Sequence, residues 1–258
     1  MAKGLTRLEP SFCERIWGST VLSPWFPDSD SKTGEVWYAG ESLLVKFIFT
    51  SANLSVQVHP PDDFAREHEG SRGKTEMWHV LAAQPGAAIA LGFRQAITQA
   101  QFQDALENHR VEELLEWVPA HPGDTFFVPA GVVHAIGSGL TICEIQQNSD
   151  VTYRLYDYGR KRELHLERGL AVSQFEPYEG KVQLPFQCEF FSAGLLRVYR
   201  ADILDGGPGR ERMWIVLEGE GTLNGQPYKR GEVWQLDDAC PPVSVEPAQA
   251  SRFLTTRV

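Results

Sequence analysis

The segment 123–134, which reads GDTFFVPAGVVH, constrains the fold more than any other part of the chain. Its apolar run is interrupted at Pro129, which cannot donate to a strand ladder, and Gly131 follows two positions later, where a tight turn needs a glycine. The pattern therefore predicts a strand, a Pro-x-Gly turn and a return strand that carries His134. A chain with this unit at its centre is expected to be mainly β.

The segment 54–59, LSVQVH, alternates apolar and polar residues with the period of two that is typical of a strand. As a strand it would turn its leucine and valines into a core and present Gln57 and His59 together on the other face. An amide oxygen and an imidazole two residues apart can reach one cation if other strands supply the remaining ligands. A half-exposed strand with an incidental histidine is the alternative interpretation of this segment alone.

The segment 76–81, EMWHVL, has the same alternation and places Glu76 and Trp78 on one face. By the same period, Lys74 projects from the side of Glu76. A second carboxylate, Glu144, lies on another predicted strand further along the chain.

Several charged and aromatic residues allow two interpretations each. Trp17 and Trp37 either belong to the core or cover the apolar face of a sugar. Lys46, inside an otherwise apolar strand, is either a snorkelling edge residue or a charge directed into a site. Arg154 follows a turn and could clamp a phosphate or stabilise an enediolate, with a surface salt bridge as the alternative.

Segment 123–134 resembles the second of the two motifs of the cupin family, which are small jelly-roll barrels that bind a metal among inward-facing strands. Because interior and exterior residues alternate along barrel strands, ligands from different strands can converge on one point. The residues expected to do so here are Gln57, His59, Glu76 and His134.

The fold class expected from these patterns is mainly β, with two cupin-like jelly-roll barrels and a small helical insertion in the first. Segment 98–118 changes to a helical period, and two short helices broken near Asn108 are expected there. The turn-rich segment 173–185 indicates a domain boundary. We therefore expect a metal-binding catalytic cupin domain at 1–178 and a cupin-like domain at 179–258, which has no histidine and so no histidine-ligated metal.

The composition excludes several classes of function. The formal net charge is −10 at pH 7, with acidic residues spread along the chain, which argues against a nucleic-acid or anionic-membrane surface. An anionic substrate would therefore need a local cationic pocket. The sequence has no apolar stretch of about 18 residues and opens without an apolar leader, so we expect a cytoplasmic protein. The four cysteines form no C-x-x-C pair, which favours reduced thiols.

Four segments, 54–63, 73–78, 123–137 and 144–160, occur together in an order that resembles the type I phosphomannose isomerases, specifically the short bacterial form. The resemblance covers most of the chain. It implies one zinc per chain, with ligands Gln57, His59, Glu76 and His134. It also implies an active-site arginine at Arg154, and roles in proton transfer or substrate orientation for Lys74 and Glu144.

The chain departs from that family at two places. His59 is followed by Pro60 and Pro61, where the family usually has a single proline. Ser19 follows Trp17 and Gly18, where the family usually has a second glycine. Neither departure removes an expected ligand.

The resemblance implies an isomerase that interconverts mannose 6-phosphate and fructose 6-phosphate, with a small-molecule sugar phosphate as partner and a monomer or small homo-oligomer as its state. This reaction moves a proton between C1 and C2 through a cis-enediol, and it needs a base near C2 and an electrophile for the oxygens. A metal held by two histidines, a carboxylate and an amide would be that electrophile. Glu144, Lys74 and a metal-bound hydroxide are each candidates for the base.

Two other classes are alternatives. A non-catalytic sugar-phosphate-binding cupin would be favoured by the loss of a ligand or of Arg154, and neither is lost. A metal-dependent cupin oxygenase would usually have a second histidine at the position of Gln57.

Overall fold

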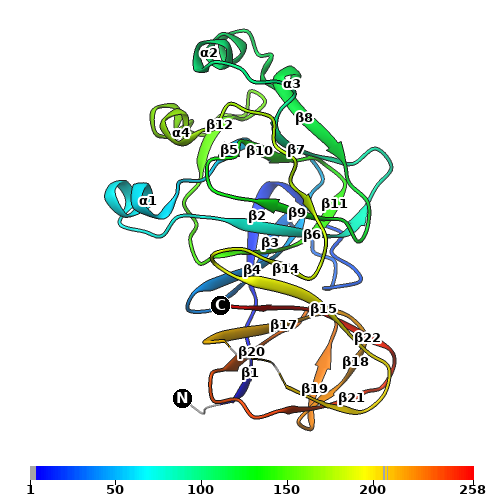
Figure 1. The fold of residues 1–258 in the computed structure, drawn as a ribbon. Helices are drawn as coiled ribbons and strands as arrows, with labels where there is room; N and C mark the ends of the chain where they lie inside the picture. The colour runs from blue at the N-terminus through cyan, green and yellow to red at the C-terminus, as the bar shows by residue number, and fades with distance from the viewer. Residues whose placement is uncertain (1–3, 206, 208) are drawn as a thin grey trace.

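The computed structural model describes residues 4–205, 207 and 209–258, and its architecture is mainly β. Figure 1 shows two stacked halves, with all four helices on the upper one. The strands form four antiparallel sheets of seven, five, six and four strands. In the described residues these ladders stay separate and do not close into a continuous barrel. The mainly β class is confirmed, whereas two jelly-roll barrels stay a prediction.

The upper half contains the seven-stranded and the five-stranded sheet. The order of the seven-stranded sheet is β13 (Lys181–Val182), β9 (Thr125–Val128), β6 (Glu76–Ala83), β11 (Leu140–Gln147), β4 (Leu43–Phe49), β3 (Thr33–Ala39) and β2 (Ser11–Ser19). The order of the five-stranded sheet is β12 (Tyr153–Tyr156), β5 (Val56–Val58), β10 (His134–Ile136), β7 (Ala88–Phe93) and β8 (Leu115–Pro119).

The lower half contains the other two sheets. The order of the six-stranded sheet is β1 (Leu5–Arg7), β20 (Val233–Asp237), β17 (Glu211–Glu218), β22 (Ser251–Arg257), β15 (Ser192–Val198) and β14 (Phe186–Gln187). The order of the four-stranded sheet is β16 (Asp202–Leu204), β21 (Val243–Pro247), β18 (Glu220–Leu223) and β19 (Gln226–Lys229). The N-terminal strand β1 thus pairs with the C-terminal half, and β13 pairs with the first half through β9.

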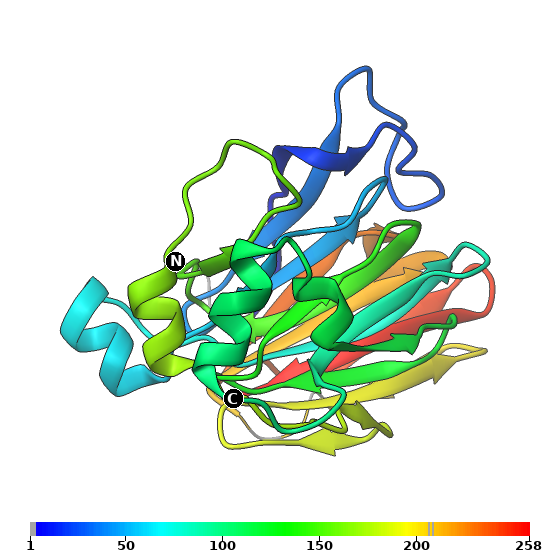
Figure 2. The same ribbon diagram turned by 90° about the horizontal axis from the view of Figure 1, so that it is seen from above.

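The helices are α1 (Asp62–Glu69), α2 (Gln99–Glu107), α3 (Val111–Leu114) and α4 (Leu166–Val172). Figure 2 shows them along one side of the upper half. The predicted helical insertion is confirmed, since α2 begins with a capping box at Thr98 and ends at Asn108 before α3 starts. None of the described helices is long and apolar enough to cross a membrane.

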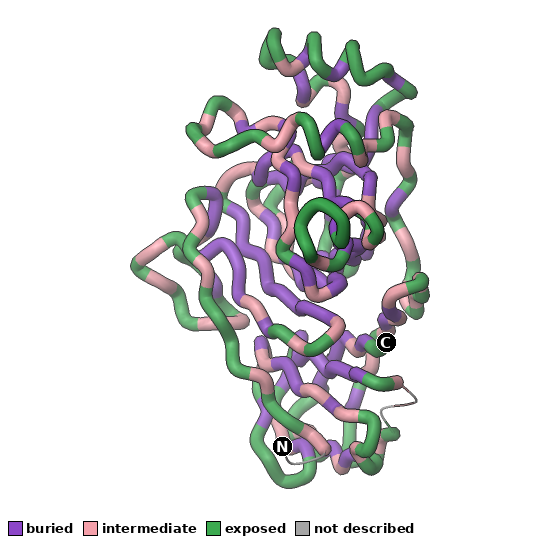
Figure 3. Tube along the Cα trace, turned by 90° about the vertical axis from the view of Figure 1, so that its left-hand side faces the viewer, coloured by how far each residue is buried: buried purple, intermediate pink, exposed green. Residues whose placement is uncertain are grey.

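Strand β4 is buried on both of its faces, and this position explains its continuous apolar sequence. On one side Val45 and Phe47 pack in a cluster with Ile215 and Leu254 of the lower half. On the other side Ile48 packs with residues of the upper half. Figure 3 shows this buried zone through the middle of the molecule. Lys46 therefore lies inside the protein rather than at an edge.

One local expectation needs correction. The strand predicted over 54–59 is shorter, because β5 includes only Val56–Val58 and the chain leaves the sheet before Pro60 and Pro61. Helix α1 follows, with Pro61 at its N-cap position and no side-chain hydrogen bond there. Asp62 lies in the first turn and accepts the main-chain N–H of Gly73 at 2.7 Å instead.

Candidate active site

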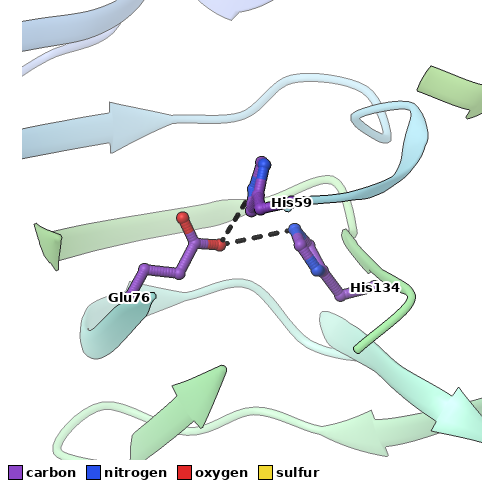
Figure 4. A group of neighbouring side chains, drawn as sticks. All are labelled: His59, Glu76 and His134. Carbon is purple, nitrogen blue, oxygen red and sulfur yellow. Dashed lines mark ion pairs between the residues drawn. The ribbon is translucent and has the colours of Figure 1, made fainter. Parts of the chain in front are cut away.

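His59, Glu76 and His134 meet in the interior of the upper half, although they come from three different segments (Figure 4). Glu76 Oε1 lies 3.5 Å from His59 Nε2 and 3.3 Å from His134 Nε2. All three side chains are at most 1% exposed. His59 follows β5, Glu76 opens β6 and His134 opens β10, so strands of both sheets contribute to one point.

The hydrogen bonds of the two imidazoles fix which ring nitrogen carries the proton. His59 Nδ1 lies 3.0 Å from the carbonyl oxygen of Val151, and His134 Nδ1 lies 2.9 Å from that of Val132. A carbonyl oxygen only accepts, so each Nδ1 must donate and each Nε2 presents a lone pair. Two nitrogen lone pairs and a carboxylate oxygen therefore face one another, and both Nε2 atoms lack a hydrogen-bond partner. A cation between these atoms would satisfy them, and this is the orientation that metal-binding histidines adopt.

The protonation states agree with a cation-binding group. Burial lowers the pKa of His59 to about 3 and also lowers the pKa of His134, so both rings stay neutral near pH 7. Burial alone would raise the pKa of Glu76, but the ammonium of Lys74 holds it well below its usual value. Lys74 Nζ lies 3.1 Å from Glu76 Oε2. The group therefore has the neutral imidazoles and the ionised carboxylate that a metal requires.

Strand register places Gln57 beside this group. On β5, Gln57 pairs with His134 of β10 on one side and with Arg154 of β12 on the other. Gln57 is half-buried and lines the cleft described below. The predicted ligand Gln57 is thus brought next to the His-Glu-His group, at a position where an amide could join it.

The Pro-x-Gly turn predicted from the sequence is present and connects the ligand-bearing segments. Val132 N–H donates to the Pro129 carbonyl at 3.3 Å, and Gly131 has φ +88°. Gly131 N–H donates to the carbonyl of His59 at 2.9 Å. The N–H of Ala130 donates to the hydroxyl of Thr75 at 3.3 Å. One turn therefore contacts His59, the residue before Glu76 and the strand that starts at His134.

A second buried group surrounds Glu144 on β11. Trp78 Nε1 donates to Glu144 Oε2 at 2.8 Å, and Lys46 Nζ lies 3.1 Å from Glu144 Oε1. Burial raises the pKa of Glu144, while Lys46 works against that rise. Burial would lower the pKa of Lys46, but the carboxylates of Glu144 and Glu35 raise it. Of the two interpretations that the sequence allowed for Lys46, the structure therefore supports a charge directed into the site and not a snorkelling edge residue.

A cleft of about 300 Å³ opens beside both groups. The catalytic candidates Lys74, Glu144 and Arg154 all contribute to its lining. Trp17, Trp37 and Lys46 line it as well. The His-Glu-His group lies behind this lining, next to Gln57 and Lys74. The structure therefore brings the residues singled out from the sequence around one cavity.

Sequence reasoning missed several residues of the cleft. Those without an earlier assignment are Arg15, Glu35, Asp150, Thr152 and Arg162. Arg15 precedes Trp17 by two residues on β2, so the strand period could have found it. Arg162 lies in the loop after β12, where no periodicity applies, and only the folded chain brings it to the cleft.

The stacked antiparallel sheets and the buried His-Glu-His group define a mainly β protein with a group that could hold a metal ion. Among known proteins, the chain is 33% identical to the mannose-6-phosphate isomerase ManA of Bacillus subtilis, over 87% of this chain and 90% of that one. It is 36% identical to GmuF of the same organism, named as a probable mannose-6-phosphate isomerase, over 76% of each chain. The chain belongs to the mannose-6-phosphate isomerase family.

Solved structures agree on the fold. The crystal structure of the mannose 6-phosphate isomerase from Bacillus subtilis superposes with a TM-score of 0.88 at 24% identity, covering 99% of this chain and 100% of that chain. A phosphomannose isomerase from Salmonella typhimurium superposes with a TM-score of 0.77 at 17% identity, over 98% and 99% of the two chains. No family model matches the chain.

Proposed function

We propose that this protein is a zinc-dependent mannose-6-phosphate isomerase, which interconverts mannose 6-phosphate and fructose 6-phosphate. The observation that carries the proposal is the meeting of two imidazole lone pairs and one carboxylate behind a cleft lined by cations. Relatives that are named for this activity, and that are similar to this chain over most of their length, support the proposal. The loss of a metal ligand would favour a non-catalytic sugar-phosphate-binding cupin, but His59, Glu76 and His134 are all present.

The residues that would hold zinc are His59, Glu76 and His134, with the amide of Gln57 as a fourth ligand. A mixed nitrogen and oxygen set of this kind suits zinc, and one ion per chain is expected. When bound, zinc would act as a Lewis acid that polarises the oxygens of the substrate.

The reaction then depends on groups of the chain itself. The carboxylate of Glu144 lines the cleft and is our choice for the base that moves the proton between C2 and C1 of the sugar. Its two donors, Trp78 and Lys46, hold it in place, and burial raises its pKa, which makes the carboxylate a stronger base. Lys74 can donate to the sugar hydroxyls, and Arg154 can stabilise the enediolate or hold the phosphate.

The remaining expectations extend this proposal. We propose a metal-binding domain at 1–178 and a supporting domain at 179–258, each a cupin-like jelly roll. One edge strand of each domain, β1 and β13, pairs with a strand of the other domain. We also propose a monomer or small homo-oligomer that works in the cytoplasm, where its four free cysteines would stay reduced.

A coupled assay for fructose 6-phosphate formed from mannose 6-phosphate tests the proposal. We expect turnover with the zinc-loaded protein and its loss after chelation. Zinc-loaded, folded protein that does not convert mannose 6-phosphate would contradict the isomerase function.

A further inference from the structure

Strand β12 and the loop that follows it carry three arginines, and two of them pair with one buried aspartate. Asp157 is 3% exposed, and its carboxylate receives Nε and Nη2 of Arg162 at 2.7 and 2.6 Å. Arg160 Nη2 lies 2.8 Å from the same carboxylate. The third arginine, Arg154, donates to the main-chain carbonyl of Glu163 at 2.7 Å rather than to a carboxylate.

The backbone of this loop is held in an uncommon conformation. Tyr158 and Gly159 both have positive φ, +54° and +77°, and the N–H of Arg160 donates to the carbonyl of Asp157 at 2.9 Å. This is the pattern of a type I′ turn, which a bulky residue such as Tyr158 rarely enters. Arg160 Nη2 also donates to the carbonyl of Asn53 at 2.9 Å and so fixes the turn near the start of β5. Strain of this kind persists where the surroundings hold the residue and is common at functional sites.

Arg162 and Arg154 line the same cleft. Burial, and then the positive charge of Arg162, lower the pKa of Arg154. The fork of Arg162 toward Asp157 uses Nε and Nη2, so Nη1 is left for another acceptor. Two neighbouring cations in a cleft favour an anion between them, and a phosphate monoester carries about −1.5 to −2 charges at pH 7.

We infer that Asp157 is a positioning residue that holds Arg162 in the cleft as the second guanidinium, beside Arg154, for the phosphate group of the substrate. The inference rests on the proposed isomerase function and assigns the phosphate end of its site. Strand register supports this placement, since Arg154 pairs with Gln57 and Gln57 with His134. At the backbone, two strand spacings, roughly 10 Å, separate Arg154 on β12 from His134 on β10, with Gln57 on the strand between them.

The test is the variant Arg162→Gln, which removes a guanidinium from a side chain that is 25% exposed and leaves Arg160 paired with Asp157. We expect its KM for mannose 6-phosphate and its inhibition constant for inorganic phosphate to rise about 10- to 100-fold, the effect of losing one charge-assisted contact, with a smaller change in kcat. Arg162→Lys should recover part of the loss. The matched control is Arg168→Gln, because Arg168 is an exposed arginine on α4 that pairs with Glu69 of α1, and its loss should leave both constants unchanged.

A second variant and a second readout separate the possible failures. Asp157→Asn should raise KM with kcat nearly unchanged, because Arg162 remains but loses its fixed orientation. The ³¹P line width of inorganic phosphate measures binding independently of turnover. Unchanged KM and phosphate binding in folded Arg162→Gln would overturn the inference, as would an equal loss of activity toward unphosphorylated mannose. Absence of turnover in the wild type would instead count against the proposed function.

Discussion

The main-chain N–H of Gly131 donates a hydrogen bond to the carbonyl oxygen of His59 at 2.9 Å. This contact joins two segments that are 72 residues apart and that each carry a histidine of the buried group. Because Gly131 has φ +88°, the contact depends on a backbone conformation that favours glycine.

Gly131→Ala should therefore weaken both the fold and the metal site. An added Cβ would lie 2.9 Å from Gln174 Nε2 and 3.1 Å from the carbonyl of Val172, and the left-handed conformation adds its own strain. We expect a loss of about 1–3 kcal/mol in the free energy of unfolding and a weaker zinc affinity. Gly86→Ala, at φ +82° with no atom within 4 Å of the new Cβ, is the control. Equal effects of the two variants on zinc affinity would show that the turn does not organise the site.

Glu144→Gln should lower kcat by about 100- to 10,000-fold while KM changes little, because the amide cannot accept the transferred proton. The amide fills the same space but has one oxygen for the two donors, Trp78 and Lys46, so we also expect a lower thermal unfolding temperature. Steady-state kinetics and a melting curve on the same sample check both parts. Nearly normal kcat in Glu144→Gln would assign the base to another residue.

The metal-free protein should lose stability in acid because of its buried histidines. Burial lowers the pKa of His79 to about 4 and that of His59 to about 3. The unfolded rings protonate near pH 6.5, so the unfolded state binds more protons and gains stability as the pH falls from about 6.5 toward 4. Each ring contributes a slope of up to about 1.4 kcal/mol per pH unit in that window.

Urea unfolding between pH 4.5 and 7.5 checks this dependence. His79 Nδ1 lies 2.9 Å from the hydroxyl of Thr125 and is away from the cleft, so His79→Asn removes one titrating group without touching the site. In this variant the slope of the free energy of unfolding against pH should fall by the amount that corresponds to about one proton. A slope that His79→Asn leaves unchanged would mean that His79 protonates normally in the folded state.

Glu211 connects the two halves and should be needed for their stability. Its carboxylate oxygens accept the main-chain N–H groups of Glu41 and Ser42 at 2.8 and 2.7 Å. Asn148, near the cleft, in turn donates to the carbonyls of Gly40 and Ser42. Glu211→Ala would leave two donors unpaired, and we expect a loss of about 2–4 kcal/mol in the free energy of unfolding. Thermal unfolding measures it.

Glu218→Ala is the matched control for Glu211→Ala. Glu218 lies on the same strand, β17, but is exposed and pairs with Arg252 on the surface, so its loss should cost less than about 1 kcal/mol. Equal thermal unfolding temperatures for the two variants would mean that the contact of Glu211 with the upper half contributes little to stability.

The sequence allowed much of the site to be predicted because its signals are local. The period of two places Glu76 and Trp78 on one face. Each of these side chains contacts a residue that lines the cleft, since Glu76 pairs with Lys74 and Trp78 donates to Glu144. The helical period over 98–118 and the break near Asn108 likewise depend on neighbours along the chain, and both are confirmed.

The rest depends on contacts between distant segments. Arg162 reaches the cleft only because Asp157 and the turn at Tyr158 hold it there, and no periodic pattern marks a loop. The pairing of β1 with β20 is set by the tertiary fold, since a three-residue strand carries almost no signal of its own. Asp62 has the residue type of a helix cap, but the N–H of Gly73 competes for its carboxylate.

The central claim is that His59, Glu76 and His134 form one catalytic zinc site. The most direct test is to add zinc stepwise to metal-free protein while measuring bound zinc and the conversion of mannose 6-phosphate. We expect activity to rise linearly and to level off at about one zinc per chain, and both quantities to be lost in His134→Ala but kept in His68→Ala, where the histidine is exposed on α1. Wild-type activity that persists without bound metal, or zinc-dependent activity that survives in His134→Ala, would contradict the claim.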